Sequence, residues 1–267
     1  WDPFRFAGIQ AGQFKAPFAA EELRSTADLV FVSRAVGQEG VLPGRGFEEP
    51  GVAVDRQLGA MLSPLEPLTI WKKYAGAYYL MVANGNGDNE LLNDNDNVAV
   101  YGRAELMYDR FVTIGGAFLV NDRTEGELPN QSNDDDTGYA ADILLQLYGG
   151  EVFFQWVELT TEFETVPEAG DRTQRAWHVQ AAYEFTTPWV DLKPGYRYAV
   201  LDPYAEVDGD LGGLDLEAQK VGYHTLGARF AHPKLPLAFF VNYTFTHEEA
   251  PYKLDNNRLQ LLAQVAF

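Results

Sequence analysis

The chain has 267 residues, of which 46% are hydrophobic, with no cysteine and a formal net charge of −19. The negative charge argues against nucleic acid as a partner, because its phosphates would be repelled. The absence of cysteine excludes disulfides, thiolate catalysis and cysteine-ligated metals. The longest apolar run, Leu235 to Val241, has seven residues, far fewer than the roughly 18 that a membrane-spanning helix needs. A helical membrane protein is therefore excluded, and a soluble domain or a β-barrel remains.

The first predicted strand, Phe4 to Phe14, stops at Lys15 and Pro17. Proline fits a strand end, because its missing N–H breaks no ladder hydrogen bond there. Some thirty residues then pass before the next predicted strands, Gly51 to Ala60 and Ile70 to Val82. The chain starts inside a predicted strand and shows no signal peptide, so we expect a processed or truncated product.

From position 98 onward, apolar and polar residues alternate, and a period of two is that of a β-strand. The faces of the first such strand carry Val98, Val100, Ala104, Leu106 and Tyr108 on one side and Tyr101, Arg103, Glu105 and Asp109 on the other. The alternation recurs at 111–122, 139–148, 175–185, 190–200, 237–246 and 257–267. Segment 151–160 is apolar at both parities, so its faces stay unassigned.

About twelve strands are predicted in this chain, each near the nine to eleven residues that cross a bilayer when tilted. Short turns are expected at 63–67, 109–110, 149–150, 186–189 and 232–236, and long loops at 84–97, 121–138, 163–174, 201–220 and 247–256. Long loops at one end and short turns at the other are typical of outer-membrane barrels. The alternative, a soluble β-sandwich, usually has strands of five or six residues. We therefore expect an all-β fold, a transmembrane antiparallel up-and-down β-barrel in the bacterial outer membrane.

Aromatic residues gather at the predicted strand ends. Tyr and Trp are common at the membrane–water interface, because their rings are apolar and their polar groups reach water. The aromatic residues at these ends are Tyr74, Tyr78, Tyr108, Tyr139, Tyr148, Trp177, Phe185, Trp189, Tyr243 and Phe267. The charged face must line the lumen, because a charge at the bilayer midplane costs about 2–4 kcal/mol in a barrel. Small residues on that face are expected to leave room for water, which predicts a pore; they are Ala99, Gly115, Ala117, Ala140, Ala182 and Gly195.

The segment 11–36, followed by Arg45 and the strand 51–60, resembles the phosphate-selective porin O and P family. The resemblance is carried by Gly12, Phe14, Lys15, Pro17, Phe18, Glu22, Leu23, Phe31, Arg34, Gly51 and Val52. It continues weakly through the strand that contains Arg197 and through the terminal Phe267. The resemblance implies a sixteen-stranded, usually trimeric porin. About four strands would then precede this chain, and residues 1–267 would form the C-terminal portion of a single barrel.

The resemblance also implies that the long connection, residues 15–50, folds into the lumen as a constriction. The residues that would set ion preference there are Lys15, Arg24, Arg34 and Arg45 on the loop, with Lys73, Arg103, Arg197, Arg229 and Arg258 on the wall. Guanidinium and ammonium groups suit phosphate oxygens and replace the hydration of a permeating anion. Acidic residues are interleaved with them, namely Asp55, Glu105, Asp142, Glu184 and Asp191. An anion-preferring pore and a weakly selective pore therefore both remain open.

The function expected from these features is passive diffusion of small hydrophilic solutes and ions, anions or phosphate among them, without enzymatic activity or a cofactor. One alternative is a structural or partner-binding outer-membrane barrel with a closed lumen. Another is an outer-membrane phospholipase, which would need a serine and a histidine exposed on the lipid face. The serines, Ser25, Ser33, Ser63 and Ser132, all fall in predicted loops or turns, which disfavours the enzyme.

No metal site is expected, because the four histidines, His178, His224, His232 and His247, lack metal-ligand spacing. Acidic runs at 93–97, 133–138 and 208–215 could offer oxygen ligands to calcium, yet none completes the twelve-residue calcium loop. We interpret them as solvated loops that face lipopolysaccharide and divalent cations. Phe267, at the end of an amphipathic strand, resembles the signal that barrel-assembly machinery recognises.

Overall fold

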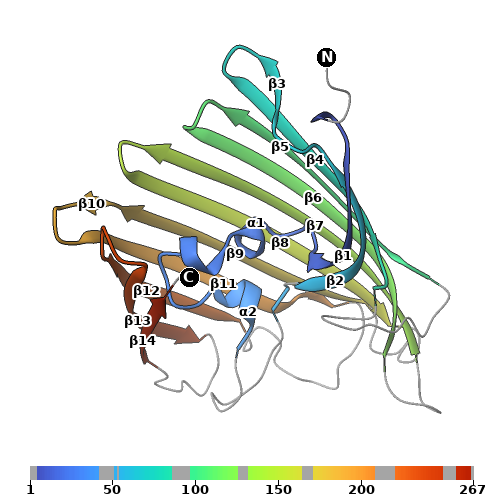
Figure 1. Ribbon diagram of the computed structural model, residues 1–267. Helices are drawn as coiled ribbons and strands as arrows, with labels where there is room; N and C mark the ends of the chain where they lie inside the picture. Colours follow the sequence, from blue (N-terminus) through green and yellow to red (C-terminus); the bar gives the residue numbers. More distant parts are fainter. Residues whose placement is uncertain are drawn as a thin grey trace.

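The computed structural model describes residues 5–41, 51–52, 54–85, 97–125, 132–163, 171–207, 220–248 and 257–265. These residues form one antiparallel sheet of 14 strands (Figure 1). The strands are β1 (Gly8–Lys15), β2 (Arg56–Ser63), β3 (Leu68–Trp71), β4 (Tyr74–Ala83), β5 (Ala99–Tyr108), β6 (Val112–Glu125), β7 (Ser132–Leu147), β8 (Gly150–Phe163), β9 (Arg172–Tyr183), β10 (Phe185–Thr186), β11 (Asp191–Val207), β12 (Val221–Ala231), β13 (Leu237–Glu248) and β14 (Arg258–Val265). The predicted all-β antiparallel fold is confirmed.

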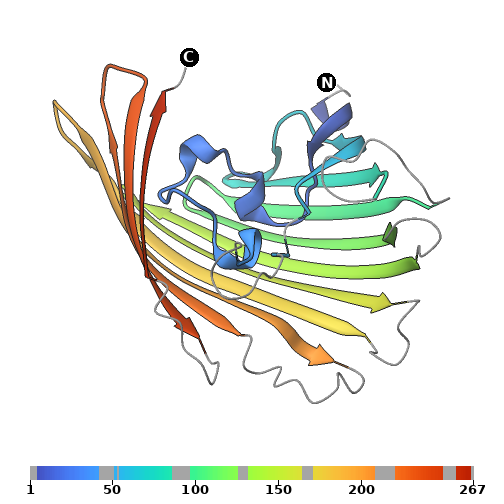
Figure 2. The same ribbon diagram turned by 90° about the horizontal axis from the view of Figure 1, so that it is seen from below.

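Each strand pairs with its neighbour in sequence, as an up-and-down topology requires. Two short strands lie off this path, β3 beside β4 and β10 beside β11, so twelve strands make the main sheet. Among the described residues β1 pairs only with β2 and β14 only with β13, and the sheet is a curved wall that does not close on itself. Its curvature gives a concave and a convex face (Figure 2).

The predicted division into two faces is also confirmed where apolar and polar residues alternate, as in β5 and β6. Val100, Leu106, Ile114 and Val120 are exposed on the convex face, whereas Arg103 on the other parity is 4% exposed. An exposed apolar face of this kind suits lipid and a buried polar one suits the lumen. Most of the predicted girdle residues within the described chain are exposed. At strand ends or turns these are Tyr74, Tyr108, Tyr148, Phe185 and Trp189, whereas Tyr139 and Tyr243 lie in the middle of β7 and β13.

The tight turns lie at one edge of the sheet and rely on left-handed backbone conformations. Lys72, Asp109 and Tyr148 have φ near +50°, and Gly149 follows at +87°, which is the twist that two-residue hairpins prefer. The turn predicted at 149–150 is centred one residue earlier. The single strand predicted at 70–82 is wrong, because the turn at Lys72 divides it into β3 and β4.

Other strand limits also differ from the prediction. β2 begins at Arg56, five residues after the predicted start, following Asp55 with φ +36°. At the opposite edge, residues 121–125, 132–138 and 201–207 are strand rather than loop. The alternation of apolar and polar residues is missing there, because strand residues beyond the lipid-facing belt need no apolar face. The sequence pattern therefore did not indicate a strand.

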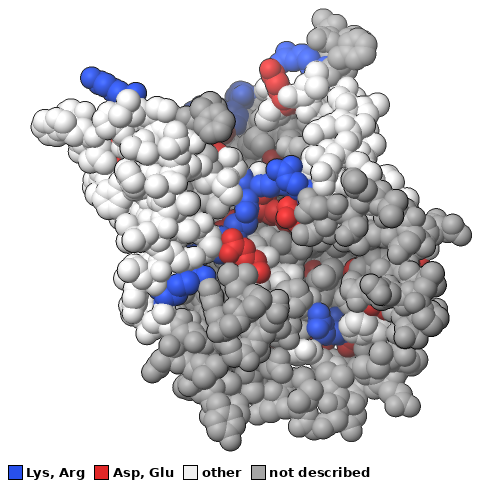
Figure 3. All heavy atoms as spheres, turned by 60° about the horizontal axis from the view of Figure 1, so that its bottom comes forward, with Lys and Arg blue, Asp and Glu red and all other residues white. Residues whose placement is uncertain are grey.

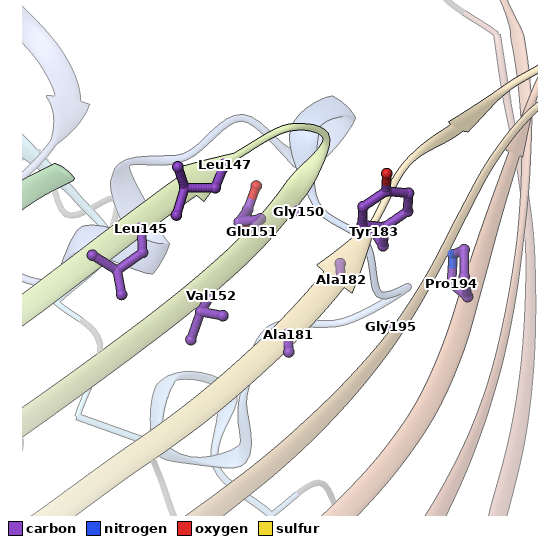
Figure 4. A pocket seen from close by; sticks show the side chains of 10 residues that line it. All are labelled: Leu145, Leu147, Gly150, Glu151, Val152, Ala181, Ala182, Tyr183, Pro194 and Gly195. Carbon is purple, nitrogen blue, oxygen red and sulfur yellow. The ribbon is translucent and has the colours of Figure 1, made fainter. Parts of the chain in front are cut away.

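A shallow groove runs over the convex face near the tight turns. The groove is lined by Leu145, Val152, Ala181, Tyr183 and Pro194 (Figure 4). It lies on the side of the sheet away from the short helices within residues 20–39. Small residues form its floor and larger ones its walls, which gives the lipid-facing surface a local hollow. No helix in the described parts of the chain has the length and hydropathy needed to cross a membrane.

Candidate functional site

The connection between β1 and β2 folds back over the concave face of the sheet (Figure 2). Residues 16–41 of this connection are called the inner segment below. It contains two short α-helices, α1 (Ala20–Leu23) and α2 (Val36–Glu39), and the 3₁₀-helix η2 (Thr26–Asp28). Apolar side chains such as Phe18, Val30 and Phe31 are buried against the wall. Residues 16–41 therefore lie against the concave wall, and their role as a pore constriction stays a prediction.

Small residues on the wall receive the larger side chains of the inner segment. A Cβ atom added at Gly138 would lie 2.8 Å from the Phe18 ring, and one at Gly195 would lie 2.9 Å from Val30 Cγ1. A Cβ at Gly115 would meet the Arg103 guanidinium at 2.3 Å. The expectation that Gly115 and Gly195 leave room for water is thus wrong, because side chains occupy that space.

Glu21 is the central anchor of the inner segment. Its side chain is fully buried and accepts hydrogen bonds from Arg197 NH1 at 3.3 Å and from the Ala35 N–H at 3.0 Å. Its own N–H donates to Gln155 Oε1 at 2.8 Å, and His178 Nε2 lies 3.9 Å from its carboxylate. Burial alone would raise the pKa of Glu21, but the His178 ring, the Arg197 guanidinium and the Ala35 N–H hold that pKa below its usual range.

Arg197 joins β11 to three parts of the inner segment. Besides Glu21, its guanidinium donates to the carbonyls of Ser33 and Arg34, each at 3.0 Å, and it lies over the Phe31 ring at 4.5 Å. The planar guanidinium has five N–H donors, which allows it to make several of these contacts at once. Because Arg197 is only 3% exposed, its charge is compensated within the protein and is not presented to a passing ion.

A second ionic contact joins the inner segment to β8 and β11. Arg24 NH2 lies 2.7 Å from Glu151 Oε1, and Lys193 Nζ lies 3.2 Å from Glu151 Oε2. Arg24 also lies over the Phe153 ring at 5.4 Å. One carboxylate therefore bridges Arg24, a predicted pore cation, and Lys193, so the three side chains carry a single excess positive charge.

A third contact lies on β5 and β7. Arg103 forms a bidentate pair with Asp142, with distances of 2.8 and 3.0 Å, and its Nε donates to Glu105 at 2.8 Å. Its NH1 also approaches the Phe18 carbonyl at 3.4 Å. Bidentate pairing fixes the guanidinium plane, and two carboxylates outweigh its charge.

Lys15 and Arg34 contact backbone carbonyls rather than carboxylates. Lys15 Nζ donates to the carbonyls of Glu22 and Arg24 at 2.6 and 3.1 Å. Arg34 NH2 approaches the same two carbonyls at 3.4 and 3.2 Å. Glu22 lies in α1 and Arg24 is its C-cap. The last turn of a helix leaves carbonyl acceptors unsatisfied and favours cations.

Glu22 differs from its neighbour Glu21 in its surroundings. Its side chain is 3% exposed, and neither carboxylate oxygen accepts a hydrogen bond from the described residues. Burial raises the pKa of Glu22 to about 7, and Asp55 adds to the effect, while Arg34 and Lys15 oppose it. The Val54 N–H also favours the charged form.

The remaining predicted site residues lie apart from this cluster. Lys73 is at the tight-turn rim, where Nζ lies 3.1 Å from Asp109 Oδ2. Arg229 on β12 lies over the Phe240 ring at 5.9 Å, and Arg258 begins β14. Arg45, like Phe267, lies outside the described residues. The structure thus gathers Lys15, Arg24, Arg34, Arg103 and Arg197 around the inner segment.

The unassigned faces of 151–160 are explained by this packing. Glu151, Phe153, Gln155 and Val157 point inward and are buried, while Val152 is exposed on the convex face. Apolar residues occur on the inner parity because the inner segment covers them. Gln155, which sequence reasoning did not single out, holds the backbone of Glu21; a polar residue within an otherwise apolar strand was the available signal.

Basic and acidic side chains lie next to one another across the hollowed face of the molecule (Figure 3). Within the described parts of the chain, no group of three or more His, Asp or Glu side chains is placed to hold a metal ion. Of the acidic runs considered for calcium, 93–96 and 208–215 lie outside those parts, and residues 133–138 belong to β7.

The fold has a counterpart among solved structures. The chain is similar to a loop L8 deletion mutant of OmpT, an outer membrane protein of Vibrio cholerae, with a TM-score of 0.56 and 8% sequence identity over 97% of this chain and 75% of that one. No protein-family model matches the chain, and no curated protein matches it. The antiparallel sheet, its apolar convex face and this likeness give the chain an outer-membrane β-barrel fold and an integral outer-membrane location.

Proposed function

We propose that the protein is a porin through which small hydrophilic solutes and ions diffuse passively, without covalent chemistry. The observation that carries this proposal is the inner segment, which is bound to the polar concave wall by buried ionic contacts at Arg197, Arg24 and Arg103. A segment held in this way narrows a lumen without filling it by apolar packing alone. Assembly as a homotrimer in contact with lipopolysaccharide, and membership of the phosphate-selective porin O and P family, belong to the same proposal.

The charge pairing favours weak ion preference over phosphate selectivity. A phosphate site needs guanidinium and ammonium groups whose donors are free to replace water around the anion. Here Arg103 faces two carboxylates, Arg197 faces Glu21, and Glu151 bridges Arg24 and Lys193. Arg103, Arg197 and Arg24 are therefore compensated within the protein and do not form a ladder of free cations along the proposed pore.

A closed-lumen scaffold is the second candidate, and the tight fit of Phe18, Val30 and Phe31 against wall glycines favours it. Conductance measurements in planar bilayers distinguish the porin from the closed-lumen scaffold. We expect the purified protein to give stable, ohmic conductance steps in KCl, with an anion-to-cation permeability ratio within about threefold of unity in a salt gradient. Correctly inserted protein that gives no steps would favour the scaffold, and a strong anion preference would restore phosphate selectivity.

A further inference from the structure

We infer that Glu22 determines the ion preference of the proposed pore by exchanging a proton, so that the inner segment carries one negative charge more or less according to pH. This inference rests on the proposed function. Glu22 lies within the same site, and pH is the condition that would change the ion preference of that site.

The geometry of Glu22 is unusual for a buried carboxylate. Glu21, the preceding residue, is equally buried but accepts hydrogen bonds from Arg197 and Ala35. The two oxygens of Glu22 accept no hydrogen bond of ordinary length and angle from the described residues, and the Val54 N–H is the backbone donor near them. An ionised carboxylate in that position is poorly compensated, and the neutral acid is much less costly to bury. Two states of Glu22 are thus close in free energy.

The charged and titratable groups around Glu22 come from four different parts of the chain. Lys15 ends β1, Arg34 precedes α2, Asp55 precedes β2 and Tyr101 lies on β5. Lys15 and Arg34 use their donors on the backbone carbonyl of Glu22, so they act on its carboxylate only through space. Asp55 repels the ionised form. Burial and Asp55 together raise the pKa of Glu22 to about 7, which agrees with the geometry.

The charge of this cluster changes accordingly. When Glu22 is ionised, it and Asp55 balance Lys15 and Arg34. When Glu22 is protonated, the cluster keeps one excess positive charge next to the lumen. A charge beside a narrow aqueous passage with low-dielectric walls changes the local concentration of permeating ions. The pore should therefore favour anions more strongly below neutral pH than above it.

The test is the reversal potential of the full protein in planar bilayers, in a roughly tenfold KCl gradient, at about pH 5.5 and about pH 8.5. We expect the anion-to-cation permeability ratio to rise about twofold or more on acidification. Glu22→Gln should hold the ratio near the acid value at both pH values. Asp55→Asn should move the midpoint of the change to lower pH, because it removes the repulsion that favours protonation.

Asp28→Asn is the matched control, since Asp28 is an exposed carboxylate of the same segment. It should shift the ratio at both pH values and leave the difference between them intact. A ratio that changes with pH equally in the protein and in Glu22→Gln would overturn the inference, and so would a ratio independent of pH in the unmodified protein. Either result leaves the pore itself in place, whereas absence of any conductance removes the proposed function instead.

Discussion

At the scale of single residues, two adjacent glutamates occupy opposite electrostatic situations. Glu21 is ionised and hydrogen-bonded, and its pKa lies below 4.5, whereas the pKa of Glu22 is raised from 4.5 to about 7. Linkage converts each displacement into a dependence of stability on pH. Glu21 contributes stability that is present above pH 4.5 and is lost as pH falls through its folded pKa. Glu22 contributes stability that is present below pH 4.5 and is lost as pH rises through about 7.

Glu21→Gln and Glu22→Gln should therefore change stability in opposite directions at about pH 8.5. Glu21→Gln leaves Arg197 buried beside a neutral amide, so we expect a loss of roughly 3 kcal/mol. Glu22→Gln removes a poorly compensated charge and should stabilise the protein by up to about 3 kcal/mol. The free energy of unfolding in detergent, measured against urea, checks both values.

Well below pH 4.5 the difference between Glu22→Gln and the unmodified protein should vanish, because the Glu22 carboxyl is then neutral in both the folded and the unfolded state. Limited proteolysis of the inner segment gives a local readout that does not require the whole sheet to unfold. If Glu22→Gln were destabilising at alkaline pH, its carboxylate would have to hold a partner, and the contrast with Glu21 would be lost.

At the scale of elements, strand alternation was predictable from sequence, and the contacts of the inner segment were not. The period of two in β5, β6 and β9 follows from lipid on one side and polar groups on the other. In β8 that rule fails, since Phe153 and Val157 face a protein segment instead of water. The cations of the candidate site could be named in advance, but their pairing depends on which strands lie beside the inner segment. Sequence spacing alone does not carry that information.

The fit between wall glycines and the inner segment gives a prediction for one element. Gly195→Leu on β11 places its Cβ 2.9 Å from Val30 Cγ1, and overpacking of this kind costs about 1–3 kcal/mol. We expect the inner segment to be displaced and cleaved faster by protease, while the sheet remains folded. Strand content by circular dichroism and the proteolysis rate measure the two parts separately.

Gly116→Leu is a suitable control for that variant. Gly116 is exposed on the convex face of β6, and the nearest atom to an added Cβ is the Ala140 carbonyl oxygen at 3.8 Å. A leucine there would meet lipid, so proteolysis of the inner segment should stay at the original rate. Equal rates for both variants would show that the wall glycines do not hold the segment.

At the scale of the whole molecule, the inner segment is an excursion from a hairpin that is already complete. Lys15 is paired with Arg56 in the ladder between β1 and β2, and the Ala16 N–H donates to the Asp55 carbonyl at 3.1 Å. The two ends of the excursion are thus held together by the sheet itself. A barrel of this kind does not need residues 16–55 for its strand order, which leaves them free to shape the lumen.

Replacing residues 16–55 with an Asn-Gly turn should therefore preserve the sheet and widen the passage. Asn-Gly supplies the two left-handed positions that a tight hairpin needs, and water would hydrate Arg197 and Glu151 once their partners are removed. We expect single-channel conductance to rise about twofold or more, with strand content unchanged. An unchanged conductance in a folded variant would mean that the narrowest part of the passage lies elsewhere. Because Glu22 is absent from this variant, its ion preference should also no longer respond to pH near neutrality.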